Sequence, residues 1–227
     1  MAANKPMNED KALKTVIDGV EHTIVDGNGN PQPTPNEEFL GKDINEKYRM
    51  GLTNSFTFKG LTLSGTFDLR YGGSIYSYTK DYMHWVGSGP ETIYNDRNPF
   101  IIPNSVVDNG DGTYSENTTP VDPTALHTFY SNGGFNYTDF AVIDRSYLKL
   151  RNLSLAYELP SSIAGKLGVR AISASVTASN ILLWTPAENM YIDPEVTTFC
   201  NNIEAKFGEF GTNPPYQTYV FGLNISF

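Results

Sequence analysis

The sequence predicts an all-β chain, an antiparallel meander that forms part of the wall of a transmembrane β-barrel. Five segments alternate apolar with polar residues, which gives each strand one apolar and one polar face. The connections between them are alternately short and long, as turns and outer loops are in outer-membrane barrels. No run of about 18 or more apolar residues occurs, which excludes a transmembrane helix.

Residues 1–45 are polar and turn-rich, and we expect an extracellular loop region with a small hairpin. A barrel segment over 46–227 follows. Its first two strands are predicted at 47–58 and 61–76, joined at Lys59-Gly60 in a tight hairpin turn. Asp68 and Arg70 share the polar parity of the second strand, and we expect them to face the barrel lumen.

Three further strands are predicted at 146–159, 170–184 and 216–227. Pro160 ends the first of them, and a short connector leads to the second. The stretches 77–145 and 185–215 lack alternation and are expected to be outer loops. Loops this long usually carry function.

Composition excludes several kinds of function. The net charge of −9 provides no basic surface for nucleic acid. Cys200 stands alone, and the histidines His22, His84 and His127 lie apart without metal-ligand spacing, so we expect no metal and no cofactor. No catalytic constellation is present, and an enzyme is not expected. Asp193 and Glu195 flank Pro194, a pattern that favours pinning of the loop over acid–base catalysis.

Several motifs resemble the C-terminal strands of the SusC/RagA family of TonB-dependent outer-membrane transporters of Bacteroidetes. They are "DRSYLKLRNLSLAYELP" (144–160), "YIDPE" (191–195) and "PPYQTYVFGLNISF" (214–227). The hairpin "NSFTFKGLTLSGTFDLRYGGSIYS" (54–77) is similar to an upstream hairpin of the same family. The resemblance covers most of residues 40–227, with its motifs in the order of the family.

This resemblance implies an outer-membrane location and an importer of oligosaccharides or peptides with roughly 22 strands around a plug domain. It also implies a SusD-like lipoprotein partner and energy from the TonB complex through that plug. No plug is recognisable in this sequence, and five strands cannot close a barrel. We therefore expect the remaining strands to come from a longer chain or from another polypeptide, with the lipid bilayer outside.

The last strand carries an alternating aromatic and aliphatic parity that ends in an aromatic residue. In this family, as in other outer-membrane barrels, such an ending resembles the signal read by the barrel-assembly machinery. The residues that would form this signal are Tyr219, Phe221, Leu223, Ile225 and Phe227.

The first outer loop concentrates aromatic and hydrogen-bonding residues that suit a sugar or peptide ligand. They are Tyr82, His84, Trp85, Tyr94, Asp96 and Arg97. The same residues could instead pack against neighbouring loops or the lipoprotein. The alternative for the whole chain is a soluble extracellular glycan-binding β-sandwich that uses this loop as its site.

Overall fold

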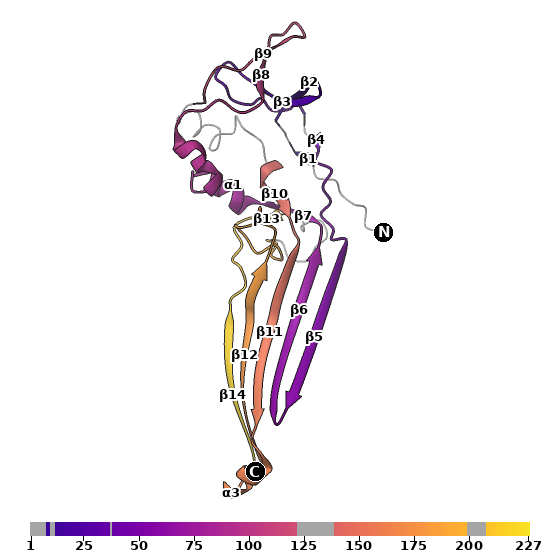
Figure 1. The fold of residues 1–227 in the computed structure, drawn as a ribbon, viewed down its shortest axis with the longest axis vertical. Coiled ribbons are helices and arrows are strands. Elements are labelled where there is room, and N and C mark those ends of the chain that lie inside the picture. The colour runs from indigo at the N-terminus through magenta and orange to yellow at the C-terminus, as the bar shows by residue number, and fades with distance from the viewer. Residues whose placement is uncertain (1–7, 10–11, 37, 122–138, 199–207) are drawn as a thin grey trace. The chain divides into compact units, whose positions relative to one another are not determined.

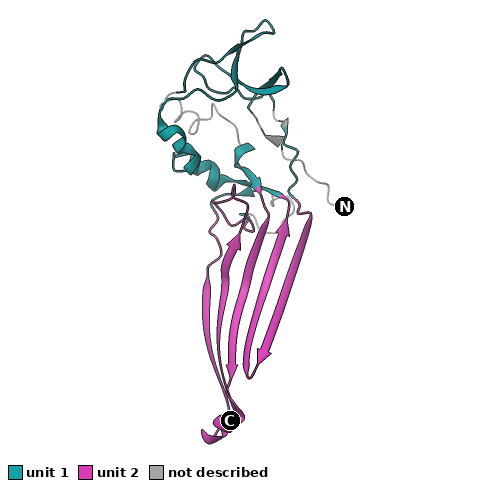
Figure 2. Ribbon diagram, viewed as in Figure 1, with its two compact units in different colours: residues 1–44, 74–143, 197–211 teal, residues 45–73, 144–196, 212–227 magenta. Residues whose placement is uncertain are grey.

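The computed structural model describes residues 8–9, 12–36, 38–121, 139–198 and 208–227 (Figure 1). The chain forms two compact units, each assembled from separate stretches of sequence (Figure 2). One unit comprises 1–44, 74–143 and 197–211, and the other comprises 45–73, 144–196 and 212–227. Within the described ranges no helix is both long and apolar enough to cross a membrane.

The second unit is built on a five-stranded antiparallel sheet in the order β14-β12-β11-β6-β5 (Figure 1). Its strands are β5 (Tyr48–Phe58), β6 (Leu61–Tyr71), β11 (Tyr147–Glu158), β12 (Ala171–Trp184) and β14 (Thr218–Ser226). Each is long enough to match the roughly 9–11 residues that a tilted strand needs to cross a bilayer.

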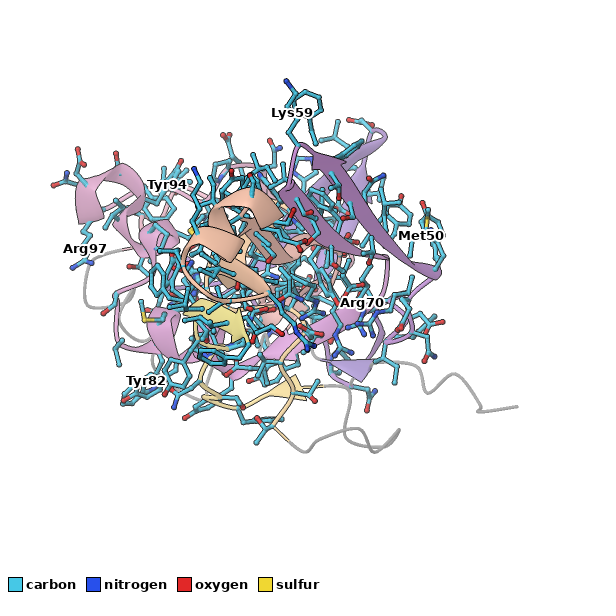
Figure 3. All side chains as sticks on the ribbon, turned by 90° about the horizontal axis from the view of Figure 1, so that it is seen from below. Met50, Lys59, Arg70, Tyr82, Tyr94 and Arg97 are labelled. Atoms are coloured by element: carbon cyan, nitrogen blue, oxygen red, sulfur yellow. The ribbon has the colours of Figure 1, made fainter. Side chains whose placement is uncertain are left out.

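The strand register keeps the apolar side chains and the polar side chains of the alternating pattern on opposite sides of the sheet. On one side, Phe56 pairs with Leu63, Leu63 with Leu155, and Val176 with Phe221. Residues directly opposite one another in a ladder point to the same side, so this side is apolar from edge to edge. We call it the apolar face, and the side that carries Thr53, Thr66 and Ser154 the polar face. Met50 and Arg70 lie on opposite sides of the ribbon (Figure 3).

A β-bulge in β11 lies where the sequence changes parity. The ladder to β6 passes from Leu150 opposite Phe67 to Asn152 opposite Thr66, which leaves Arg151 as an extra residue. Arg151 and Asn152 are both polar, and without the bulge one of them would fall on the apolar face. The bulge therefore lets Leu148 and Leu150 share a face with Leu153 and Leu155.

Two short connections join strands of this sheet. Lys59 and Gly60 both have positive φ, 48° and 84°, as a two-residue type I′ hairpin requires. The second connection holds the short helix α3 (Ser161–Lys166), which begins after Pro160 and leads into β12.

The strand predicted at 61–76 is shorter in the structure. β6 ends at Tyr71, where Gly72 and Gly73 follow with φ of 79° and 85°. The chain then enters β7 (Ser74–Ser77), which belongs to a different sheet in the order β10-β7-β13. Two consecutive residues in the left-handed region cannot continue a strand, so the prediction ran past a break.

The first unit contains several small elements. Its strands are β1 (Asn8–Glu9), β2 (Lys14–Ile17), β3 (Val20–Val25), β4 (Glu38–Phe39), β7, β8 (Ser105–Asp108), β9 (Tyr114–Glu116), β10 (Val142–Asp144) and β13 (Gly208–Glu209). They form sheets β1-β4, β2-β3-β8-β9 and β10-β7-β13. A core cluster joins Ile44 and Val142 with Leu40 and Tyr76.

The stretch predicted as the first outer loop contains regular structure. It holds the α-helix α1 (Tyr78–Trp85) and the 3-10 segments η1 (Pro90–Arg97) and η2 (Asp139–Ala141), besides β8, β9 and β10. The predicted hairpin near the start of the chain corresponds to β2 and β3, which pair from Lys14 opposite Thr23 to Ile17 opposite Val20.

Candidate functional site

The apolar face of the five-stranded sheet is exposed in every strand. Although Leu150 is only 6% exposed, most large side chains of this face have exposed fractions between 37% for Phe67 and 80% for Phe221. They are Met50, Leu52, Phe56, Phe58, Leu61, Leu63, Phe67, Leu153, Leu155, Tyr157, Leu182, Trp184, Tyr219, Phe221, Leu223 and Ile225. A contiguous apolar surface of this extent is rare on a soluble monomer and marks a face made for a membrane or another protein.

An aromatic pair closes one end of the hairpin on this face. Tyr48 and Tyr71 are directly paired, with ring centroids 5.0 Å apart and an interplanar angle of 19°. Tyrosine combines an apolar ring with a polar tip, which suits the boundary between hydrocarbon and water.

The polar face carries an ionic network centred on Asp68. The Arg49 guanidinium donates to both carboxylate oxygens of Asp68, at 2.9 and 3.3 Å. Arg151, the bulge residue, donates to Asp68 Oδ2 through Nη2 at 2.5 Å and through Nε at 3.1 Å. The Tyr147 hydroxyl adds a hydrogen bond at 3.2 Å. One carboxylate therefore joins three neighbouring strands.

Arg151 and two further cations also bind the irregular stretch that follows β12. Arg151 reaches Glu195 through Nη1 at 2.7 Å and also through Nη2. Lys149 donates to Asp193 at 2.6 Å and to Glu195 at 2.7 Å. Arg145 donates from Nε to the Pro194 carbonyl at 2.8 Å. We call Arg49, Asp68, Lys149, Arg151, Asp193 and Glu195 the ionic network.

The network balances its own charge, with three cations against three carboxylates. The side chains of Lys149 and Asp193 are only 4% and 7% exposed, whereas that of Arg49 is 47% exposed. Buried charges are tolerated when they are paired and hydrogen-bonded in this way. Such a set fastens segments together, and it leaves no unmatched charge for a ligand.

Glu195 and Arg145, which lie outside the strands, have shifted pKa values. Burial would raise the pKa of Glu195, but hydrogen bonds from Arg151 and Lys149 outweigh it and lower the pKa to about 2. Burial, with the nearby charge of Arg70, lowers the pKa of Arg145 to about 10. Both groups remain charged near neutral pH.

Arg70 lies beside the network, and its side chain is 8% exposed. Its guanidinium lies over the Tyr147 ring, 5.6 Å from the centroid, and 3.6 Å from a Glu46 oxygen. Asp68 and Arg70 thus both lie on the polar face of β6. On the paired strand β11, Lys149 lies opposite Asp68 and Tyr147 lies opposite Arg70.

The residues predicted to bind a ligand in the first outer loop divide into two groups. Tyr82 and Trp85 are 47% and 48% exposed, and their rings stack with centroids 5.5 Å apart. Tyr78, one turn earlier, stacks on Tyr82 at 5.8 Å. Residues at i, i+4 and i+7 lie on one side of a helix, so α1 presents a row of three aromatic rings.

His84 lies apart from the aromatic row. Its side chain is buried, with Nδ1 2.8 Å from the Lys80 carbonyl oxygen and its ring 4.8 Å from that of Phe140. It faces away from the aromatic row because it lies two and six residues from Tyr82 and Tyr78 along the helix. The His84 side chain therefore contacts groups of the first unit, including Glu91 at 3.4 Å from Nε2, and its ligand-binding role stays a prediction.

The other predicted ligand residues follow on η1. Tyr94 is 54% exposed and its ring meets that of Phe100 edge-on at 4.6 Å. Asp96 and Arg97 have positive φ, 52° and 61°, and the Arg97 guanidinium donates to the Gly87 carbonyl at 2.6 Å. The Arg97 side chain thus bonds to a residue of its own loop. Figure 3 labels Tyr82, Tyr94 and Arg97.

Helix α1 owes its start to a distant carboxylate. Ser77 caps the helix by accepting from the Lys80 amide at 3.1 Å and donates to Glu209 at 3.2 Å. Glu209 also accepts from the Thr79 hydroxyl at 2.8 Å and from its amide at 3.3 Å. A carboxylate at this place satisfies free N–H groups of the first turn.

The remaining predicted site residues lie on the last strand. Tyr219, Phe221, Leu223 and Ile225 occupy the apolar face of β14, paired to Ala178, Val176, Ala174 and Ile172. Phe227 follows the strand and is 84% exposed. Their role as an assembly signal stays a prediction. Within the residues that the structure describes, no group of three metal-ligating side chains gathers; His127 and Cys200 lie outside them.

Comparison with known proteins finds similarity to TonB-dependent receptors. No family model matches the chain. TonB-dependent receptor P3 of Formosa agariphila is 29% identical over 208 residues, which is 89% of this chain and 18% of that receptor. TonB-dependent receptor P39 of the same organism is 25% identical over 230 residues, covering 100% of this chain and 20% of the receptor. The chain thus spans about a fifth of the curated relatives it matches.

Solved structures share the fold. A structure of the RagAB peptide transporter aligns with a TM-score of 0.58 and 20% identity, covering 98% of this chain and 23% of that one. RagAB in a "closed-closed" state, described as a peptide importer, aligns with a TM-score of 0.54 over 97% of this chain and 22% of that one. The antiparallel sheet therefore corresponds to part of a transporter structure.

Proposed function

We propose that the chain forms one stretch of the barrel wall of a TonB-dependent receptor. The proposal starts from its distant homology to such receptors over about a fifth of their length. The receptor would import an oligomer, a peptide or an oligosaccharide, across the outer membrane. The wall continues beyond this chain in strands supplied by the same or another polypeptide.

The observation that carries the proposal is the exposed apolar face opposite a charged, cross-linked polar face. In a barrel the first would contact lipid and the second would line the interior. A soluble sandwich would cover its apolar face with a second sheet. The large exposed fractions of Phe56, Leu223 and Phe221, at 68%, 69% and 80%, do not support such a layer.

The edges of the sheet support the same proposal. Among the described strands, β5 pairs only with β6 and β14 only with β12. Unpaired backbone groups at an edge are costly in a bilayer, so further strands would have to continue the ladder on both sides.

Orientation follows from the connections. The Lys59-Gly60 turn and the α3 connection leave one end of the sheet, so this end would be periplasmic. The stretches 72–146 and 185–217 leave the other end and would be extracellular. The aromatic row Tyr78, Tyr82 and Trp85 would then belong to the outer loops, where it could contact cargo or a SusD-like lipoprotein. Energy would come from the TonB complex through a plug.

The experiment compares arginine substitutions at adjacent positions of β14 in the assembled receptor. Leu223→Arg would place a charge in lipid, which costs about 2–4 kcal/mol near the bilayer midplane. Asn224→Arg would place the same charge in the interior. We expect the first variant to lower the amount of folded receptor in the outer membrane strongly and the second to be tolerated. Equal effects of the two would contradict the proposal.

A further inference from the structure

The stretch 185–196 is attached to the sheet by side chains. Its backbone hydrogen bonds among described residues are local, from Asn189 to Pro186 and from Val196 to Asp193. Its side-chain links include those of the ionic network, together with Arg145 to the Pro194 and Glu195 carbonyls and Glu188 to the Asp144 amide. An attachment of this kind can be released without breaking any strand pairing.

Three of the cations that bind this stretch lie close together in the sequence. Lys149 and Arg151 lie two residues apart in β11, and Arg145 lies four residues before Lys149, ahead of the strand. Residues two apart on a strand share a face, so Lys149 and Arg151 present their donors on the same side of β11, where both reach Glu195. The bulge at Arg151 adds the forked donor that reaches Asp68 on one side and Glu195 on the other.

The acceptor side is equally specific. Asp193 accepts from Lys149 and, through its other oxygen, from the Glu195 amide at 3.0 Å. This turn orients Glu195 toward Arg151 and Lys149. Glu195 and Arg151 retain side-chain exposures of 28% and 23%, so water reaches the contact between them.

We propose that Asp193-Pro194-Glu195 is an electrostatic latch that holds 185–196 across the polar face and gates the passage beneath it. This rests on the proposed function, since only in a barrel does the polar face line a passage. With the latch closed, the stretch narrows the interior over β5, β6 and β11. With the latch open, it moves aside while the sheet stays intact.

The experiment uses the assembled receptor in intact cells, in a Cys200→Ser background. A reporter, Ser55→Cys, lies on the polar face of β5, four residues beyond the Gly51 position that pairs with Asp68. It would therefore lie on the periplasmic side of the latch. A membrane-impermeant maleimide added outside measures the access from the extracellular side.

Glu195→Gln removes the charge that three cations contact, and we expect the reporter to be labelled about tenfold faster, the change that loss of a charged hydrogen bond brings. Glu188→Gln is the matched control, since Glu188 lies in the same stretch and accepts a hydrogen bond from the Asp144 amide, which is outside the ionic network. It should leave the rate unchanged. Raised salt should accelerate labelling of the parent and not of Glu195→Gln.

Equal labelling rates in the parent, Glu195→Gln and Glu188→Gln would overturn the proposal of a latch. If the amount of assembled receptor is normal in these variants, the proposed barrel-wall function still stands. If Glu195→Gln fails to assemble, Asp193→Asn carries the test, because it removes one contact of Lys149 and leaves Glu195 with Arg151. Faster labelling in Asp193→Asn supports the latch, and an unchanged rate overturns it.

Discussion

Arg151 contacts two carboxylates of the ionic network, and its geometry explains how. A guanidinium offers a planar fork of donors, so it can serve Asp68 and Glu195 at once. The ammonium of a lysine keeps the charge but cannot span both carboxylates in the same plane.

Arg151→Lys should therefore destabilise the folded receptor by about 1–3 kcal/mol, as loss of charged hydrogen bonds does. The measurement is urea unfolding of the receptor in lipid vesicles. Arg170→Lys is the matched control, because Arg170 is exposed and uses its backbone amide to pair with Ser226. A similar shift in both variants would contradict the role given to Arg151.

The depressed pKa of Glu195 predicts how the latch responds to acid. A carboxylate whose pKa is lower in the folded state stabilises that state above its ordinary pKa, near 4.5. This contribution falls as the pH drops below 4.5 and is lost once the pH passes about 2.

Hydrogen exchange of 185–196 should therefore be constant from pH 7 to about pH 5, after correction for the intrinsic rate, and rise below pH 4.5. The Glu195→Gln variant should show fast exchange throughout. A rise centred near pH 6 would point to another group and contradict the assignment.

Sequence parity predicted part of this site. It placed Asp68 and Arg70 on one face of a strand, and both lie on the polar face. The loop-pinning interpretation of Asp193 and Glu195 agrees with their contacts to Lys149 and Arg151. Sequence analysis missed four residues of the site, Arg49, Tyr147, Lys149 and Arg151. The alternation in "YLKLR" nevertheless puts the last three on one face. What joins them is a pairing of distant strands that no local pattern contains.

At the scale of elements, the β5–β6 hairpin depends on its turn. Gly60 has φ of 84°, and a Cβ there would lie 2.6 Å from the Glu158 carbonyl oxygen. Gly60→Ala should thus destabilise the hairpin by more than the roughly 1 kcal/mol of left-handed strain alone.

The matched control is Gly165→Ala in α3, where a Cβ meets nothing within 4 Å and φ is not positive. It should be neutral or slightly stabilising, by about 0.4–1 kcal/mol. Urea unfolding in vesicles reports both. If Gly60→Ala behaves like the control, the turn does not fix the register.

Alternation of side chains located the long strands because each has one uniform apolar face. Helix α1 escaped prediction for a physical reason. It is only eight residues long, and its first turn is completed by Glu209, which lies about 130 residues away in the sequence. A short helix is unstable alone, so tertiary capping decides its presence.

At the scale of the whole molecule, the sheet has two edges and an apolar face that its own described residues leave exposed. Both features are costly in water, and the edges are also costly in lipid. A closed barrel formed with further strands removes both costs, because the edges pair and the apolar face contacts hydrocarbon.

The most direct test is a spin-label scan of positions 61–69 along β6 in the assembled receptor, reconstituted in lipid vesicles. Oxygen, which partitions into lipid, should relax labels strongly at odd positions such as Leu61, Leu63 and Phe67. It should relax them weakly at even positions such as Thr62 and Ser64. Alternation with this parity is the result we predict. Uniform accessibility, or alternation of the opposite parity, would contradict a wall that faces lipid with its apolar side.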